Sequence, residues 1–375
     1  MHIGLNLLHA LPEIGGGWNY IANVVSALGE CDDVNTYLAF VTPISQCLVP
    51  SQPNFTKVLI KINSRSRPQR VLYENTLLQG MAYWHHLNCM HWFANVQAIL
   101  NTVPAVVTIH DLQPVLNYAD FSFIKRSYLR YMLAATVKRA SMLLPVSQAT
   151  ANDLQHVLGS DPARVAVIPA ILDMRFKPAA GDIVDAFRAK YRLPAKFWLY
   201  VAHMYPHKNH VRLLQAYHDL KVRGFKPWPL VLRGDPGGAE VVIRQTLKRL
   251  ELERDVILLP RLEGSELPAL YSAASALVFP SLYEGGGIPV IEALACGCPI
   301  TASDIPSVRE FAGDAASYFD PLNTDAIARA VLACQNDAEG HKIKQQAGLA
   351  RAEEFRPRPV IRKLLQAYSR ASAST

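Results

Sequence analysis

Phe279-Pro-Ser-Leu-Tyr-Glu284-Gly-Gly-Gly-Ile-Pro-Val-Ile-Glu292 is the segment that most strongly indicates the fold of this chain. It begins at the end of an apolar run that predicts a buried strand, and its three glycines predict a tight turn. Pro289 favours the first turn of the helix that follows. Strand, glycine turn and helix can bind phosphate, because backbone N–H groups are free and the helix presents its positive dipole end. A solvated glycine loop is the simpler interpretation.

Similar apolar runs divide the chain into two series of strands that alternate with helical segments. Such alternation predicts α/β architecture with mainly parallel sheets. A chain of 375 residues also exceeds what one hydrophobic core usually serves. We therefore expect two Rossmann-like, doubly wound domains, residues 1–175 and 176–356, and a C-terminal helix and tail, 357–375, with the helix packing back on the first domain. The predicted strands are Ile3–Leu8, Thr36–Val41, Val58–Ile60, Ala105–Ile109, Met142–Val146, Phe197–Ala202, Pro229–Arg233, Val256–Leu259, Ala276–Phe279 and Pro299–Ala302.

Composition limits the class of protein. Half of the residues are hydrophobic and 18% are charged, which indicates a globular chain. The net charge of +7 suits an anionic partner, whether a nucleotide, a nucleic acid or an acidic membrane face. Six cysteines without a Cys-x-x-Cys pair favour a reducing cytoplasm. His2–Leu11 is expected to be a first strand and not a signal peptide, and no apolar run reaches the roughly 18 residues of a membrane-spanning helix.

Polar residues at strand ends supply candidate chemistry. Glu284 and Glu292 can accept paired hydrogen bonds from sugar or ribose hydroxyls. Cleaving a sugar–phosphate bond builds negative charge on the departing diphosphate, which a metal or fixed positive groups must stabilise. The chain has no Asp-x-Asp pair, so Lys208 is the expected cation. A second positive group is expected to assist Lys208, and it is either His207, protonated by the diphosphate, or Arg233.

His110 and Asp111 follow the predicted strand Ala105–Ile109, at the edge where open α/β sheets bind ligands. A lone histidine there is more often a packing or hydrogen-bonding residue than a catalyst.

Together these motifs resemble the retaining glycosyltransferases of family 4, which have the two-domain GT-B fold with a cleft between the domains. The spacing of Glu284 and Glu292 matches the E-x7-E signature of that family. The resemblance implies that Glu284 lies by the donor sugar, that Glu292 holds the ribose, and that His110 faces the reacting centre. It places Gly16 or Gly17, and the backbone from Gly285 through Gly286 and Gly287 to Ile288, beside the donor. Gly286 and His207 stand where relatives often have Phe and Arg.

The resemblance further implies a metal-independent transfer that retains the anomeric configuration and needs no cofactor besides the nucleotide-sugar substrate. The segments around His110 and Lys125 look most like bacterial surface-polysaccharide mannosyltransferases, so GDP-mannose is the expected donor and a UDP-hexose the alternative. The expected acceptor is a lipid-linked or free saccharide, and nucleic acid is not an expected partner. Contact with the cytoplasmic face of a membrane and the oligomeric state stay open.

Two stretches of the first domain fit the acceptor side. Trp84, His85, His86, Trp92 and Phe93 are expected to be core and acceptor-pocket residues. The cations Lys125, Arg126, Arg130, Lys138 and Arg139 form one helix face, which is either a solvated surface or a guide for an anionic acceptor.

Two other classes stay as alternatives. A non-catalytic nucleotide-sugar-binding protein would explain the departures at Gly286 and His207. A nucleotide-dependent oxidoreductase would explain the Rossmann-like opening, but the chain lacks the G-x-G-x-x-G sequence and an acid after Thr36–Val41.

Overall fold

The computed structural model describes residues 1–116 and 123–373. They form two compact units. Unit 1 holds residues 1–116, 123–171 and 355–373, and unit 2 holds residues 172–354. Each unit has its own parallel sheet of six strands, which confirms the predicted α/β class.

Unit 1 is built on a sheet with the strand order β3-β2-β1-β4-β5-β6. Its central strands are buried except at His2, because helices cover both faces of a parallel sheet. The strands are β1 (His2–Asn6), β2 (Thr36–Val41), β3 (Phe55–Leu59), β4 (Cys89–Trp92), β5 (Ala105–Ile109) and β6 (Met142–Pro145). The helices are α1 (Gly16–Cys31), α2 (Arg67–Asn75), α3 (Leu77–Trp84), α4 (Gln113–Leu116), α5 (Phe123–Arg139) and α6 (Gln148–Leu158).

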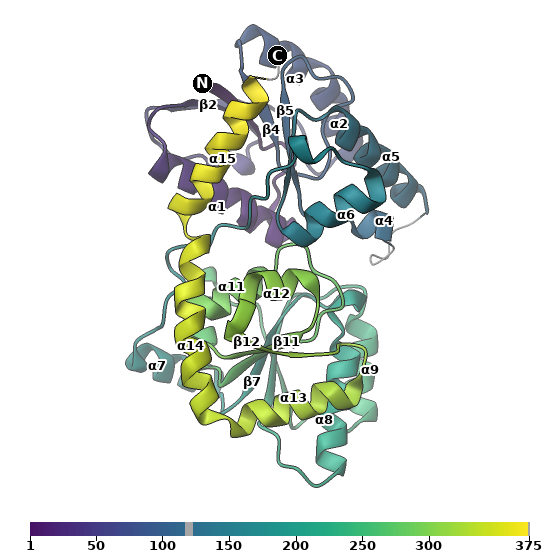
Figure 1. Cartoon of the computed structure of the whole chain (residues 1–375), viewed down its shortest axis with the longest axis vertical. Helices are drawn as coiled ribbons and strands as arrows, with labels where there is room; N and C mark the ends of the chain where they lie inside the picture. The colour runs from purple at the N-terminus through teal and green to yellow at the C-terminus, as the bar shows by residue number, and fades with distance from the viewer. Residues whose placement is uncertain (117–122, 374–375) are drawn as a thin grey trace. The chain divides into compact units, whose positions relative to one another are not determined.

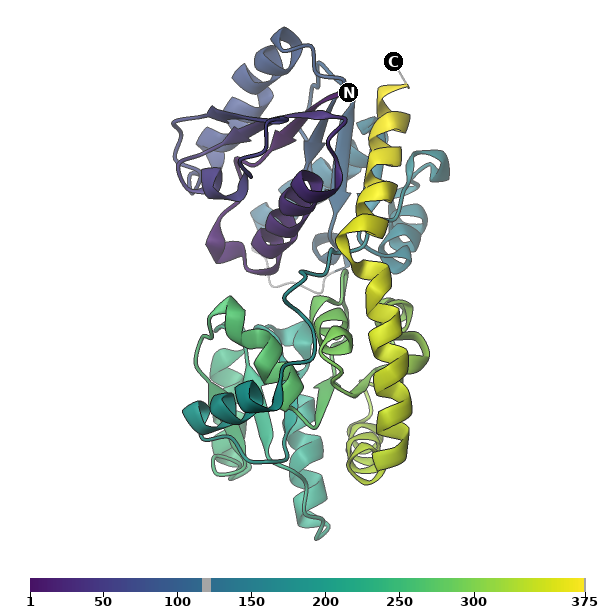
Figure 2. The same cartoon turned by 90° about the vertical axis from the view of Figure 1, so that its left-hand side faces the viewer.

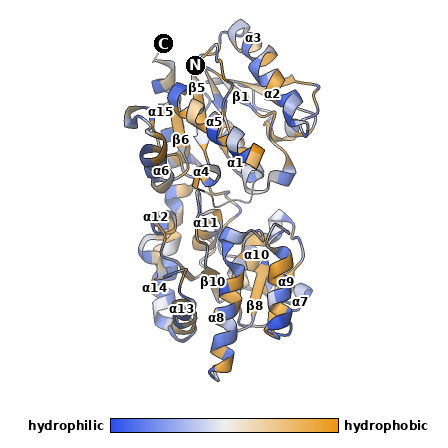
Figure 3. Cartoon of the chain, turned by 90° about the vertical axis from the view of Figure 1, so that its right-hand side faces the viewer, coloured by the Kyte–Doolittle hydropathy of each residue, from blue (hydrophilic) through white to orange (hydrophobic). Residues whose placement is uncertain are grey.

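Unit 2 repeats this plan with the order β12-β11-β10-β7-β8-β9. Figure 3 shows its strands β8 and β10 coloured as hydrophobic. The strands are β7 (Trp198–Val201), β8 (Leu230–Arg233), β9 (Val256–Leu259), β10 (Ala276–Phe279), β11 (Ile300–Ser303) and β12 (Ala316–Phe319). The helices are α7 (Gly181–Tyr191), α8 (His210–Val222), α9 (Glu240–Arg249), α10 (Leu267–Ala273), α11 (Ile288–Ala295), α12 (Pro306–Ala312), α13 (Thr324–Asn336) and α14 (Ala338–Ala352).

Strand order reverses once in each sheet, between β1 and β4 in unit 1 and between β7 and β10 in unit 2. The chain leaves the two central strands of each sheet in opposite directions, so the loops at their carboxyl ends diverge. Ligands of open α/β sheets bind at this point. The fold therefore marks one expected ligand position in each unit.

Helix α15 (Pro357–Ser372) belongs to unit 1. It packs against α1 and against strands β4 to β6, and Figures 1 and 2 show its yellow ribbon beside α1. Val360, Ile361 and Leu364 are buried on this face, as the apolar spacing of the segment predicts. The C-terminal helix thus completes the core of the first unit, as expected from the sequence.

Within the described residues, none of the helices is both long enough and apolar enough to cross a bilayer.

Candidate functional site

The switch point of unit 2 brings two of the predicted residues into contact. Lys208, in a short 3-10 turn after β7, places its Nζ 2.7 Å from Oε1 of Glu284, in the loop after β10. The two side chains are only 17% and 9% exposed. A mostly buried ion pair of this kind fixes both groups in place. The pair stands at the carboxyl ends of the two central strands, where the fold predicts a ligand.

Several hydrogen bonds fasten the Lys208 turn to the Glu284 loop. Leu282 N donates to the carbonyl of His207 at 2.8 Å. The Asn209 amide donates to the carbonyl of Pro280 at 3.0 Å. Tyr200, from within β7, donates its hydroxyl to the Lys208 carbonyl at 2.7 Å. The position of the cation is therefore set by backbone contacts as well as by its ion pair.

The glycine turn starts helix α11 as the sequence predicts. Gly287 is its N-cap residue and has φ +47°, a left-handed conformation that favours glycine. A Cβ at this position would lie 2.7 Å from a ring carbon of Phe311. Gly285 and Gly286 precede it without side chains, so the backbone before α11 is open to close approach. The helix adds the positive end of its dipole.

Arg233 ends strand β8, which lies next to β7 in the sheet. Its Nε is buried and has no hydrogen-bond partner among the described residues. Burial lowers the pKa of His203, and the charges of Arg233 and Lys208 lower it further, against the effect of Asp235. The two cations thus act on the same imidazole at the end of β7. A Cβ at Gly234 would lie 1.7 Å from the carbonyl oxygen of Ala202, so this close approach of the two loops requires glycine.

His207 is mostly buried and stacks on Tyr205, with ring centroids 5.9 Å apart. Burial and the neighbouring Lys208 lower its pKa to about 4, against the effect of Glu284. The imidazole is therefore neutral at pH 7 in the absence of a ligand. His207 and Arg233 are the two residues expected to assist Lys208 in stabilising the diphosphate. Unlike the imidazole, a guanidinium does not need a bound ligand in order to be charged.

Glu292 lies in α11 and accepts a hydrogen bond of 2.8 Å from the Tyr271 hydroxyl. Burial raises its pKa to about 7, while Tyr271, Arg175 and Arg233 act to lower it. A carboxyl that accepts one hydrogen bond from a phenol can accept further hydrogen bonds from a diol. Within the described residues, no group of three His, Cys, Asp or Glu side chains is placed to hold a metal ion.

Unit 1 carries the other predicted site residues. His110 follows β5, its backbone N donates to Oδ1 of Asn95 at 2.6 Å, and its Nε2 lies 2.8 Å from the Phe93 carbonyl. That carbonyl can only accept, so Nε2 carries the proton and Nδ1 faces elsewhere as an acceptor. Tyr20 packs edge-on against the ring at 4.8 Å. Burial lowers the pKa of His110.

Asp111 accepts a hydrogen bond from Gln113 N at 3.1 Å, so one of its oxygens serves the turn into α4. Gly16 and Gly17 form the first turn of α1, after Gly15 with φ +58°. A Cβ at Gly16 would meet no atom within 4 Å. The predicted residues therefore gather into two sets, one at the switch point of unit 2 and one at the carboxyl edge of the sheet in unit 1.

Sequence reasoning missed Tyr200, Asn209 and Tyr271, which hold the predicted residues in position. Asn209 has φ +62° and donates its amide to the carbonyls of Pro280 and Pro321. Its place directly after Lys208 was a usable signal, because Asn tolerates the left-handed conformation. The tyrosines had no such signal, since a buried phenol in an apolar run looks like core.

Comparison with known proteins now identifies the family. A family model described as "Glycosyltransferase Family 4" matches residues 14–176, and one described as "Glycosyl transferases group 1" matches residues 184–348. The chain is 30% identical to O-antigen chain mannosyltransferase B of Escherichia coli, over 70% of each chain. The chain belongs to glycosyltransferase family 4.

Two further comparisons agree. O-antigen chain mannosyltransferase RfbU of Salmonella typhimurium is 28% identical over 84% of this chain and 86% of its own length. The structure of HepE from Anabaena in complex with UDP-glucose superposes over the full length of both chains with a TM-score of 0.77 at 18% identity, which supports the GT-B fold. The chain is therefore a glycosyltransferase, and the non-catalytic and oxidoreductase alternatives are set aside.

Proposed function

We propose that this chain transfers mannose from GDP-mannose to a saccharide acceptor in surface glycan synthesis, with retention of configuration and without a metal ion. The Lys208–Glu284 pair beside the glycine turn of α11 carries the proposal. It combines a fixed cation, a carboxylate and a helix N-terminus, which are the groups that a departing diphosphate and a sugar require. Both curated relatives named above are O-antigen mannosyltransferases, which favours mannose as the sugar.

In the proposed reaction, the bond between the anomeric carbon and the diphosphate oxygen breaks while an acceptor hydroxyl attacks the same face. The acceptor proton passes to the departing phosphate oxygen, so GDP leaves with the electron pair of the broken bond. Lys208 and Arg233 stabilise the charge that develops on the diphosphate. Glu292 accepts hydrogen bonds from the ribose hydroxyls. Glu284 and His110 orient the donor sugar.

A UDP-hexose is the second candidate donor, because the structurally similar HepE was solved with UDP-glucose. We further propose that the acceptor is lipid-linked and that the chain works in the cytoplasm, at the face of the membrane that carries the acceptor. The exposed cations of α5 support this, since basic surfaces attract anionic lipids.

Thermal unfolding in the presence of GDP, UDP, ADP or NAD tests the donor. A ligand that binds only the folded chain stabilises it by about 2.7 kcal/mol at one hundred times its Kd. We expect GDP to raise the melting temperature most, and Lys208→Ala and Glu292→Ala each to remove the effect. A shift with UDP alone would replace GDP-mannose by a UDP-hexose. Turnover of GDP-mannose by the responsive protein, with the product's anomeric configuration read by NMR, tests retention; an unchanged rate after treatment with EDTA tests metal independence.

A further inference from the structure

The chain leaves unit 1 after residue 171, and its next residues, 172–179, form a crossing segment that belongs to unit 2. Phe176 of this segment is only 2% exposed. Its ring meets the ring of Tyr271, from α10, edge to face, with centroids 6.2 Å apart. The Tyr271 hydroxyl in turn donates to Oε2 of Glu292 at 2.8 Å. A line of contacts therefore runs from the crossing segment to the carboxyl that is proposed to bind the ribose.

Hydrogen bonds hold the crossing segment in a turn. Oδ1 of Asp173 accepts from the backbone N of Arg175 at 2.8 Å, and its carbonyl accepts from the backbone N of Phe176 at 3.1 Å. Nε of Arg175 lies 3.2 Å from Oδ2 of the same aspartate. The backbone N of Ala179 donates to the hydroxyl of Ser272 in α10 at 3.0 Å. The turn thus orients Arg175 and Phe176, and the last bond ties the segment to the helix that carries Tyr271.

The crossing segment also acts on the charge of Glu292. Burial raises the pKa of Glu292 to about 7. Four neighbouring groups modify this effect: Tyr271, Arg175 and Arg233 act to lower the pKa, and Asp173 acts to raise it. Two of the four belong to the crossing segment. A carboxylate accepts hydrogen bonds at both oxygens, whereas a protonated carboxyl gives up part of that capacity.

We propose that Arg175 and Phe176 are positioning residues for Glu292, so that ribose binding at Glu292 is coupled to the conformation of the crossing segment. The inference rests on the proposed function for the binding of a nucleotide, but only for the ribose, which GDP and UDP share. Because coupling is reciprocal, a bound ribose stabilises the turn, and a disturbed turn weakens ribose binding. The segment by which the chain enters unit 2 thus responds to the donor.

The contribution of the two ribose hydroxyls to affinity tests the proposal. Isothermal titration calorimetry of the full chain compares GDP with 2′,3′-dideoxy-GDP, which lacks both hydroxyls. We expect the unmodified chain to prefer GDP by about tenfold or more, because the dideoxy nucleotide loses hydrogen bonds to a charged group. Phe176→Leu should reduce this preference by about threefold, since Tyr271 loses the ring that packs against it.

Phe187→Leu is the matched control for Phe176→Leu. Phe187 is 5% exposed and packs on Tyr191 with ring centroids 4.8 Å apart. The Tyr191 hydroxyl donates to Glu266 at 2.9 Å, so the same three residue types are in contact away from the proposed ribose site. Phe187→Leu should also lower the free energy of unfolding, but it should prefer GDP as strongly as the unmodified chain does.

Arg175→Met tests the effect on charge through the pH dependence of the same preference. Loss of the guanidinium raises the pKa of Glu292 further, so the carboxylate forms at a higher pH. The preference for GDP should therefore appear at a higher pH in Arg175→Met than in the unmodified chain. Arg223→Met is the control, because Arg223 is similarly exposed and is paired with Asp325 at 2.7 Å. Its pH profile should match that of the unmodified chain.

Hydrogen exchange measures the coupling from the side of the crossing segment. The amides of Arg175, Phe176 and Ala179 are hydrogen-bonded, so their exchange rates report the opening of the turn. GDP should slow this exchange by about fivefold. At equal saturation, dideoxy-GDP should slow it less, because it leaves Glu292 without a ribose diol.

Equal preferences for GDP in Phe176→Leu and Phe187→Leu would overturn the proposal, as would a pH profile that Arg175→Met leaves unchanged. Equal protection of the segment by GDP and dideoxy-GDP would overturn the coupling. If UDP binds in place of GDP, the proposed donor fails, and the same comparison with 2′,3′-dideoxy-UDP decides the present proposal separately. If Phe176→Leu does not fold, Arg175→Met decides, because that side chain is 43% exposed.

Discussion

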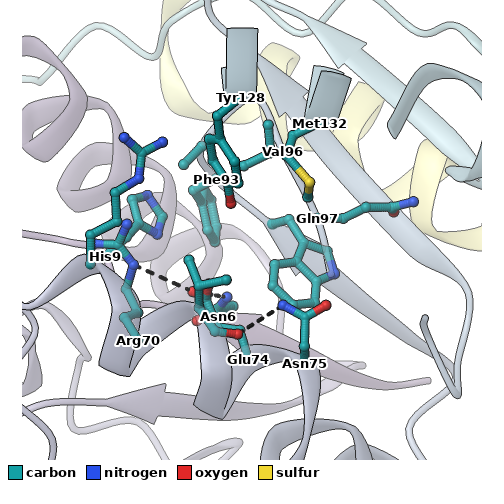
Figure 4. Close-up of a pocket in the computed structure, with 14 residues that line it drawn as sticks. Asn6, His9, Arg70, Glu74, Asn75, Phe93, Val96, Gln97, Tyr128 and Met132 are labelled. Carbon is teal, nitrogen blue, oxygen red and sulfur yellow. Dashed lines mark hydrogen bonds and ion pairs between the residues drawn. The ribbon is translucent and has the colours of Figure 1, made fainter. Parts of the chain in front are cut away.

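At the switch point of unit 2, Lys208 is ion-paired with Glu284 just before a glycine turn, and Arg233 ends the neighbouring strand β8. At the switch point of unit 1, Arg70 and Glu74 face each other among aromatic rings (Figure 4). The strand order is the same in both sheets. One topology thus presents a lysine–glutamate pair beside a glycine turn in one unit, and two arginines and a glutamate among aromatic rings in the other.

Two buried histidines of unit 1 have lowered pKa values. Burial lowers the pKa of His9 and of His91 to about 3. His91 bonds Tyr368 of α15 at 2.7 Å and Thr108 of β5 at 2.8 Å, so it joins the C-terminal helix to the sheet. The comparison indicates that the glycine turn and the N-terminus of α11, more than net charge, suit unit 2 to a diphosphate.

Lys208→Ala should have the largest effect. We expect kcat/KM to fall by about 10² to 10³, because a fixed cation on the leaving group is lost, and the free energy of unfolding to fall by about 3 kcal/mol, because Glu284 is left buried without its partner. Steady-state assays measure kcat/KM, and urea denaturation measures the free energy of unfolding. The double variant Lys208→Met with Glu284→Gln should be more stable than Lys208→Ala, because it leaves no buried charge unpaired, but it should not recover turnover. Lys221→Ala, which breaks a more exposed pair with Asp255, is the control. Normal turnover in Lys208→Ala would show that Lys208 does not stabilise the departing diphosphate.

Gly287→Ala should have the next largest effect, and Gly159→Ala is its matched control. Both glycines have left-handed backbones, with φ +47° and +64°, but a Cβ meets Phe311 at Gly287 and no atom within 4 Å at Gly159. Gly159→Ala should cost about 1–2 kcal/mol of unfolding free energy from backbone strain alone, and Gly287→Ala about 1–3 kcal/mol more from crowding. Only Gly287→Ala should weaken the thermal shift with GDP. Equal shifts in both variants would show that the start of α11 does not bind the nucleotide.

Much of this fold could be predicted from the sequence because ten strands of the described residues overlap the mainly apolar runs that predict strands. Thr36–Val41, Ala105–Ile109, Val256–Leu259 and Ala276–Phe279 begin and end where expected. Strand β4 was missed, because Cys-Met-His-Trp places His91 in its middle, and only the partners Tyr368 and Thr108 explain a buried imidazole there. Strand β12 was missed as well, since Ala-Ser-Tyr-Phe is short and half polar.

The candidate site divides in the same way. Ser147 is the N-cap of α6, where its Oγ accepts from Thr150 N at 3.0 Å, and a serine cap can be predicted from the sequence because capping is a local property. The contact of Lys208 with Glu284 joins residues 76 positions apart, and the sequence gives their types but not their distance. The neutral state of His207 could not be predicted either, since its pKa depends on burial by residues distant in the chain. The predicted roles of these residues remain predictions.

Two buried tyrosines, one in each unit, test the same comparison through smaller losses of stability. The Tyr200 hydroxyl donates to the Lys208 carbonyl, and the Tyr368 hydroxyl bonds His91, both at 2.7 Å. Replacing either by Phe should cost about 1–3 kcal/mol of unfolding free energy, because a buried partner loses its hydrogen bond. Urea denaturation measures this cost. Tyr200→Phe should also weaken GDP binding, whereas Tyr368→Phe should not. A weaker GDP response in Tyr368→Phe alone would reverse the assignment of the nucleotide to unit 2.

Glu292 should make the stability of the chain depend on pH. Its pKa is raised to about 7, first by burial, so the folded chain keeps a proton that the unfolded chain releases near pH 4.5. Stability from this group is therefore greatest below about pH 4.5 and is lost as the pH rises toward 7. Buried histidines with lowered pKa act in the opposite direction, so only a difference between variants isolates Glu292. The melting temperature of Glu292→Gln, relative to the unmodified chain, should rise between pH 5 and pH 8. A constant difference would mean that Glu292 is already ionised at pH 5 in the folded chain, and that Arg175 and Arg233 outweigh its burial.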